Sequence, residues 1–230
     1  MIKDPIQFWT ARMQDHCLFL HDGIIVSSEG LSEELSESRE AKKVQKALSV
    51  AKEMKTLAKS ALNSWIVYHN NRDDENQLSK AMEITRLVKE SMRDHLKANQ
   101  WIGYNYLGVV EHMIKELNLL QSHIDESWTM EYELIFWQQH NPDDIALMGH
   151  LLDPGEPCYT KIFLKAAHQG NRISVKNIKK LIEFVQQDLE MNEEIKQDQP
   201  AHIIHPLLAL HEKKEHEYCL YRLKKFLNEN

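Results

Sequence analysis

His112-Met-Ile-Lys-Glu116 and His211-Glu-Lys-Lys-Glu215 share the pattern His-x-x-x-Glu and lie 99 residues apart. The histidine and glutamate of each copy are four residues apart, a spacing that places both on one face of a helix. That face carries apolar residues in both copies: Val109, Leu119 and Leu120 around the first pair, and Leu207, Leu208 and Tyr218 around the second. Each pair therefore interrupts a stripe that should face a protein core.

A second repeated motif precedes the first one in each half of the chain. Phe8-Trp9 is followed by Asp15-His16, and Phe136-Trp137 is followed at the same spacing by Asp143-Asp144. These copies are 128 residues apart, so the second half has 29 fewer residues between its motifs (128 − 99). The shared order of motifs indicates an internal duplication. Because polar residues are repeated as well as apolar ones, we expect the duplication to repeat a site.

Apolar residues recur at the helical spacing i, i+3, i+4 and i+7 along most of the chain, and no alternating β-branched segment competes with them. With 7 Gly and 6 Pro among 230 residues, the composition argues against a sheet protein with many tight turns. Helices are predicted over residues 5–26, 31–68, 75–99, 104–123, 127–152, 156–168, 174–196 and 200–227. The predicted fold is all-α, with two tandem four-helix bundles, residues 1–125 and 126–230, from an internal duplication.

Composition also limits the function. A net charge of −7 argues against non-specific binding of nucleic acid, which needs a basic surface. The three cysteines are far apart and no CxxC occurs, so neither a disulfide framework nor a thiolate zinc site is indicated. The N-terminal residues lack the apolar stretch of a signal peptide, and no segment approaches transmembrane length. We therefore expect a cytoplasmic protein without nucleic-acid or membrane partners, and a homo-oligomer stays open.

The polar residues on apolar stripes predict a metal site in the first half. His16 shares its stripe with Trp9 and Met13, as the pair His112 and Glu116 shares its own with apolar residues. An ionised carboxylate is costly to bury without a partner, and a cation held between facing helices removes that cost. Two imidazoles and one carboxylate suit a divalent first-row metal, and with open positions they suit non-haem iron.

The second half offers a related but different set. Asp144 stands at the position equivalent to His16, and His140 lies one turn earlier on the same face. With His211 and Glu215, the set has two histidines and one or two carboxylates. Because a carboxylate replaces an imidazole, we predict that the two sites differ in affinity or in metal preference.

Simpler interpretations compete with a metal site. A single His-x-x-x-Glu is usually an exposed pair that contributes a few tenths of a kcal/mol, although two equivalent copies on apolar stripes favour a site. Asn141-Pro142-Asp143-Asp144 is also typical of a helix start, and Pro206 raises the same question for the last helix. We expect a continuous helix that is kinked at Pro142. Weaker candidates that could orient or complete the ligand sets are His21, Asp22, Glu90, Asp94, His95, His150, Glu193 and Glu194.

Several stretches resemble a known family. The Phe-Trp pairs, HMIKEL at 112–117, LLDPGE at 151–156 and PLLALHEKKEH at 206–216 are similar to a bacterial family known as domain of unknown function number 2935. The resemblance spans essentially the whole chain and implies two tandem four-helix bundles with a metal site in each. It implies these ligands: His16, His112 and Glu116 in the first site, and Asp144, His211 and Glu215 in the second. The chain departs from the family by having Asp144 where a histidine is expected, and the family supplies no reaction.

The sequence thus predicts a metal-binding helical protein with one His/carboxylate site in each half. Iron is the expected metal, with manganese or zinc next, and a redox or oxygen-related role fits such a centre. One alternative is a helical interaction or regulatory protein whose buried His and Glu form a hydrogen-bonded network without metal. Another is a metal-dependent hydrolase that activates a bound water. Whether the chain is an enzyme stays open.

Overall fold

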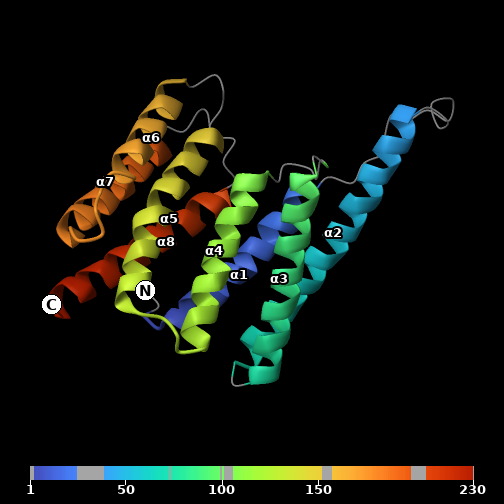
Figure 1. The fold of residues 1–230 in the computed structure, drawn as a ribbon, viewed down its shortest axis with the longest axis horizontal. Coiled ribbons are helices and arrows are strands. Elements are labelled where there is room, and N and C mark those ends of the chain that lie inside the picture. Colours follow the sequence, from blue (N-terminus) through green and yellow to red (C-terminus); the bar gives the residue numbers. More distant parts are fainter. Residues whose placement is uncertain are drawn as a thin grey trace. The chain divides into compact units, whose positions relative to one another are not determined.

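The computed structural model describes residues 3–24, 39–72, 74–98, 100, 106–151, 157–197 and 206–229. These residues form eight α-helices and no strand, which confirms the all-α prediction. The helices, drawn in Figure 1, are α1 (Pro5–Gly23), α2 (Arg39–Asn70), α3 (Glu75–Lys97), α4 (Leu107–Ile124), α5 (Met130–Leu151), α6 (Pro157–Gly170), α7 (Ile178–Gln197) and α8 (Pro206–Glu229). Within the described residues, no helix is both long and apolar enough to cross a membrane.

The chain divides into two compact units. Phe8–Leu120 form one, here called the N-terminal unit, and Gln121–Asn230 together with Met1–Gln7 form the other, the C-terminal unit. The predicted bundles, residues 1–125 and 126–230, place the division a few residues later than this. Their origin by duplication stays a prediction.

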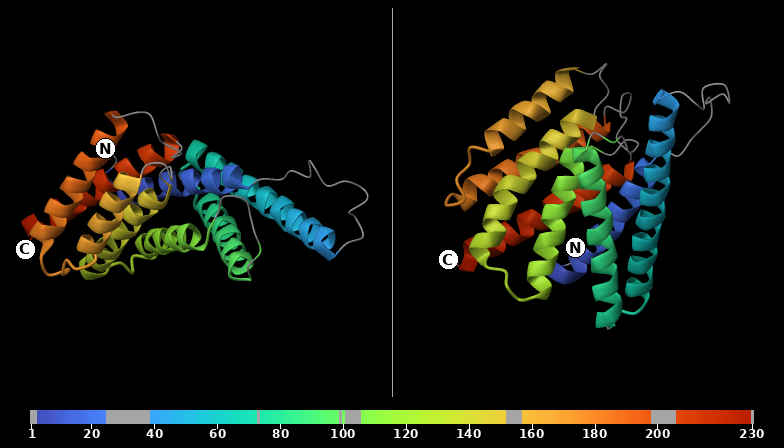
Figure 2. Two further views of the ribbon diagram at one scale, coloured as in Figure 1. Left: turned by 90° about the horizontal axis from the view of Figure 1, so that it is seen from above. Right: turned by 45° about the vertical axis from the view of Figure 1, so that its right-hand side comes forward.

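In the N-terminal unit, α2 packs along α3, and Figure 2 shows this pair from two further sides. The turn between them ends at Asp74, whose side chain accepts hydrogen bonds from the backbone N–H groups of Asn76 and Gln77 and so caps α3. A buried hydrogen bond fixes the two helices together, because Trp65 Nε1 donates to Thr85 Oγ1 at 2.8 Å. The core of this unit is rich in methionine and tryptophan.

In the C-terminal unit, α5 packs along α6 and α7 packs along α8, with further contacts of α5 with α7 and α8. Gly149 lets α5 approach α6 closely, since a Cβ atom at that position would lie 2.8 Å from the Cβ of Phe163. A buried ion pair joins α5 to α8: Arg222 donates from Nε and Nη2 to the Glu133 carboxylate at 2.7 and 2.6 Å. The guanidinium also lies 4.9 Å from the ring centre of Phe226.

Pro142 and Pro206, for which a helix start was considered, occupy different positions in their helices. Pro142 lies inside α5, which continues through it to Leu151, so the prediction of a continuous helix is confirmed and the helix-start interpretation is wrong. Pro206 is the first residue of α8, the position where a missing backbone N–H costs nothing. The sequence predicts that the second helix of the second half is short. That helix is α6, which has 14 residues, whereas the second helix of the first half, α2, has 32.

Candidate metal centre

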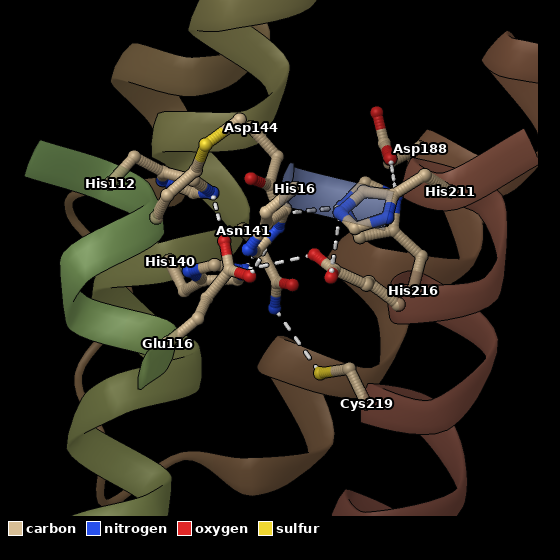
Figure 3. A network of polar contacts seen from close by, with 12 residues as sticks. His16, His112, Glu116, His140, Asn141, Asp144, Asp188, His211, His216 and Cys219 are labelled. Atoms are coloured by element: carbon tan, nitrogen blue, oxygen red, sulfur yellow. Dashed lines mark hydrogen bonds and ion pairs between the residues drawn. The ribbon is translucent and has the colours of Figure 1, made fainter. Parts of the chain in front are cut away.

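A single carboxylate joins two imidazoles in the N-terminal unit. Glu116 on α4 places Oε2 2.9 Å from His16 Nε2 and Oε1 2.9 Å from His112 Nε2. His16 comes from α1, and His112 lies one turn before Glu116 on α4 (Figure 3). The three side chains are buried, with exposed fractions of 1%, 7% and 0% for His16, His112 and Glu116. The structure thus brings all three predicted residues of the first half together.

A lysine from α3 completes this cluster. Lys89 is fully buried, and its ammonium donates to the backbone carbonyl of Met113 at 2.6 Å. Its Nζ also lies 3.1 Å from His16 Nδ1 and 3.3 Å from Met13 Sδ. A charged lysine can only donate, so Nδ1 of His16 accepts and a neutral His16 then carries its proton on Nε2, facing Glu116. The cluster therefore contains its own positive charge.

The surroundings of Glu116 favour its ionised form. Burial acts to raise the pKa of Glu116, but the adjacent His16 and His112 outweigh burial, and the pKa lies well below its usual value. A carboxylate that is ionised, buried and held by two imidazoles is chemically suited to bind a metal ion. Lys89 opposes this use, because its ammonium would repel a cation and its hydrogen bond holds the proton of His16 on the ligand nitrogen.

The C-terminal unit repeats the same carboxylate bridge. Glu215 on α8 places Oε1 2.9 Å from His211 Nε2 and Oε2 3.2 Å from His140 Nε2. All three side chains are buried. Sequence spacing makes Asp144 the equivalent of His16, yet the contact to the glutamate that His16 makes in the N-terminal unit is made here by His140. We call His16–Glu116–His112 and His140–Glu215–His211 the two His–Glu–His sets.

Asp144 belongs to a further cluster beside the second set. Its Oδ2 lies 3.3 Å from His140 Nε2 and 3.4 Å from His216 Nε2. The other ring nitrogen of His216 pairs with Asp188 of α7 at 2.5 Å (Figure 3). Burial acts to lower the pKa of His216, but Asp188 and Asp144 outweigh it, and the pKa lies well above its usual value. Asp144, Glu212 and His216 each offer one ligand atom, and these atoms lie within 4.8 Å of one another.

Four residues of these clusters were absent from the sequence-based prediction: Lys89, Asp188, Glu212 and His216. No pattern within a single helix marks any of them. Lys89 and Asp188 are 99 residues apart (188 − 89), the offset that also relates His112 to His211 (211 − 112). The helices that carry them, α3 and α7, begin 103 residues apart (178 − 75), so this offset alone does not identify either residue as part of a site.

The weaker ligand candidates named from the sequence either contact other residues or have side chains outside the described residues. Glu90 pairs with Arg86, Asp94 with Arg93, His95 with Gln100, and His21 with Asp22. The side chains of His150, Glu193 and Glu194 lie outside the described residues.

Comparisons with known proteins agree with the helical fold and leave the function open. No family model matches the chain. The chain is 23% identical over 269 residues to uncharacterized protein L567 of Acanthamoeba polyphaga mimivirus, covering 99% of this chain and 80% of that protein. It is similar to the crystal structure of an uncharacterized protein from Bacillus cereus G9241, with a TM-score of 0.67, 13% identity, and coverage of 96% of this chain and 88% of that one. The buried His and Glu groups among the described residues could hold a metal ion.

Proposed function

We propose that this chain is a metal-binding helical protein that holds divalent first-row metal ions on its two His–Glu–His sets. The observation that carries the proposal is the repeated bridge. Glu116 and Glu215 each place one carboxylate oxygen on the Nε2 atom of a histidine one turn earlier and the other on a histidine from another helix. A bridge that recurs with the same atoms and burial is better explained by a common ligand than by packing.

Iron is the metal that we propose first, with manganese or zinc next. Two neutral imidazoles and one carboxylate form the ligand set typical of non-haem iron(II), which leaves positions open for other molecules. Bound iron would supply redox or oxygen-related chemistry. The residues of this chain would bind the ion through the carboxylate and the Nε2 atoms, and the surrounding apolar core would exclude water.

A network without metal is the second candidate for the N-terminal unit, and Lys89 favours it. The ammonium brings a buried positive charge to His16, and it holds the proton of His16 on the nitrogen that a metal would need. On this alternative, His16, Glu116 and Lys89 form a buried hydrogen-bonded network that serves the stability of the fold.

Anaerobic titration of the metal-free chain with Fe²⁺ tests the proposal. We expect about one iron ion on each His–Glu–His set of the wild-type protein, and we expect Glu116→Gln and Glu215→Gln each to weaken the binding of one of these ions by at least about tenfold. Glu111→Gln on α4 and Glu217→Gln on α8 are matched controls, because each changes a partly exposed glutamate on the same helix. An optical band that responds to dioxygen would support a redox role.

Different results would contradict parts of the proposal. Iron binding that is unchanged in both bridge variants would exclude the His–Glu–His sets as ligands. Loss of binding in Glu215→Gln alone, with Glu116→Gln equal to wild type, would assign the N-terminal set to the metal-free network.

A further inference from the structure

The C-terminal unit concentrates buried acids around its histidines. Asp144, Asp188, Glu212 and Glu215 are exposed by only 0%, 3%, 2% and 0%. They come from three different helices, α5, α7 and α8. The histidines of the same cluster are His140, His211 and His216, so four carboxylates accompany three imidazoles. Carboxylates that are buried together are costly unless their negative charge is balanced.

The corresponding positions of the N-terminal unit are not acidic. The offset of 99 residues relates Lys89 to Asp188, Met113 to Glu212 (212 − 113), and Leu117 to His216 (216 − 117). Leu107, which begins α4, and Pro206, the first described residue of α8, follow the same offset (206 − 107), whereas α3 and α7 begin 103 residues apart, at Glu75 and Ile178 (178 − 75). One unit therefore has an ammonium and two apolar side chains where the other has two acids and an imidazole.

We propose that Asp144, Glu212 and His216 form a separate site for a divalent first-row cation, with Asp188 as the residue that orients His216. The ligand atoms come from α5 and α8 and lie within 4.8 Å of one another, close enough for one ion to contact all three. In the N-terminal unit, the buried positive charge beside a histidine is the ammonium of Lys89, which contacts His16 Nδ1 at 3.1 Å.

The orientation of His216 supports binding through Nε2. Its Nδ1 pairs with Asp188 Oδ2 at 2.5 Å, while its Nε2 faces Asp144 Oδ2 at 3.4 Å. Histidines that bind metals characteristically donate their second ring nitrogen to a carboxylate, which fixes the ring and places the lone pair on the metal side. In the N-terminal unit the direction of the hydrogen bond is reversed. There His16 Nδ1 accepts from Lys89 Nζ, whereas His216 Nδ1 donates to Asp188.

The ligand set indicates the kind of cation. Two carboxylates favour hard divalent ions, and the imidazole favours manganese, iron or zinc over calcium and magnesium. This site is distinct from the His140–Glu215–His211 set, because neither Glu212 nor His216 takes part in that bridge. The two sites adjoin, because Asp144 Oδ2 also lies 3.3 Å from His140 Nε2, and variants of Glu212 and Glu215 test their occupation separately.

Titration of metal-free full-length protein with Mn²⁺ tests this site, with the signal of free Mn²⁺ followed by electron paramagnetic resonance. We expect Glu212→Gln and Glu212→Met to lower the affinity for one Mn²⁺ ion by at least tenfold. Glu212→Met installs the residue found at the matching position 113. The matched control Glu217→Gln, on the same helix, should bind as wild type does. Asp188→Asn leaves all three ligands in place and should lower the affinity for the same ion by about 10- to 100-fold.

The outcomes separate this site from the proposed function. If the His–Glu–His sets hold no metal, Glu215→Gln equals wild type while the Glu212-dependent ion still binds, which supports the site. If Glu212→Gln, Glu212→Met and Asp188→Asn all bind Mn²⁺ as Glu217→Gln does, the site is refuted, whatever the other sets bind. Far-UV circular dichroism confirms that each variant keeps its helices, and Asp188→Asn decides the question if the Glu212 variants lose them.

Discussion

Replacing Lys89 by methionine should change stability and metal affinity in opposite directions. Lys89→Met keeps a long, flexible side chain in the core but removes the ammonium and its contacts with Met113 O, His16 Nδ1 and Met13 Sδ. In metal-free protein, His16 and the carbonyl of Met113 then lose the charged group that donates to them.

The cost follows from those contacts. A hydrogen bond from a charged group contributes about 1.5–3 kcal/mol, and Lys89 donates to the Met113 carbonyl and contacts His16 Nδ1 as well. Because methionine fills most of the space, we expect a loss of about 3 kcal/mol in the free energy of unfolding of metal-free protein. For a unit of this size, that lowers the thermal midpoint by on the order of 10 °C.

Metal affinity should respond in the other sense. Without the ammonium, His16 can place its proton on Nδ1 and offer Nε2 to a cation, and the local repulsion disappears. At an effective dielectric constant of about 20, the repulsion between two unit charges a few ångströms apart is about 3 kcal/mol. We therefore expect Fe²⁺ or Mn²⁺ to bind the His16–Glu116–His112 set at least about tenfold more tightly in Lys89→Met than in wild type.

The assay combines thermal unfolding, followed by circular dichroism, with metal titration of the same preparations. Lys80→Met is the matched control, because Lys80 is exposed on the same helix α3 and should change neither quantity. Lower stability together with unchanged or weaker metal binding would refute the view that the ammonium competes with a metal ion. Unchanged stability would refute the stabilising role of the Lys89 contacts.

Three further predictions concern the C-terminal unit. Glu133→Gln should lower the free energy of unfolding by about 3–5 kcal/mol in chemical denaturation, because it leaves the buried guanidinium of Arg222 without its carboxylate. Gly149→Ala should cost about 1–3 kcal/mol in the same measurement, since the new methyl group meets Phe163 Cβ at 2.8 Å. Burial lowers the pKa of His123 although Glu133 acts in the opposite direction, so the unfolded chain binds a proton that the folded chain does not. Its contribution to stability should therefore decline as the pH falls through about 6.5; His123→Gln should flatten the dependence of the thermal midpoint on pH there, and an unchanged slope would contradict this assignment.

Most of the fold could be predicted from the sequence because helical periodicity is local information. The prediction placed the start of α1 at Pro5 and of α3 at Glu75, where the structure begins both helices. It began the last helix at residue 200, and residues 200–205 lie outside the described part of the chain.

The candidate site was only partly predictable, for reasons of geometry. His112, Glu116, His211 and Glu215 could be found because their spacing and their apolar neighbours occur within single helices. Lys89 could not, because lysine is rarely buried and no local pattern marks its partner. Glu212 and His216 each follow a motif residue directly, so they point about 100° away from it around the helix. Only the packing of α8 inside its unit shows that this second face is buried as well.

Lys89 has a consequence for how each unit depends on its surroundings. A positive charge attached to the chain is present once per molecule at any dilution, and no chelator can remove it. The ion proposed for Asp144, Glu212 and His216 is instead subject to mass action, so its contribution to stability grows with the logarithm of its free concentration. On this assignment, metal scarcity would loosen the acidic cluster of the C-terminal unit, while the N-terminal unit keeps the ammonium of Lys89. The relative stability of two parts of one polypeptide would then depend on the amount of available metal.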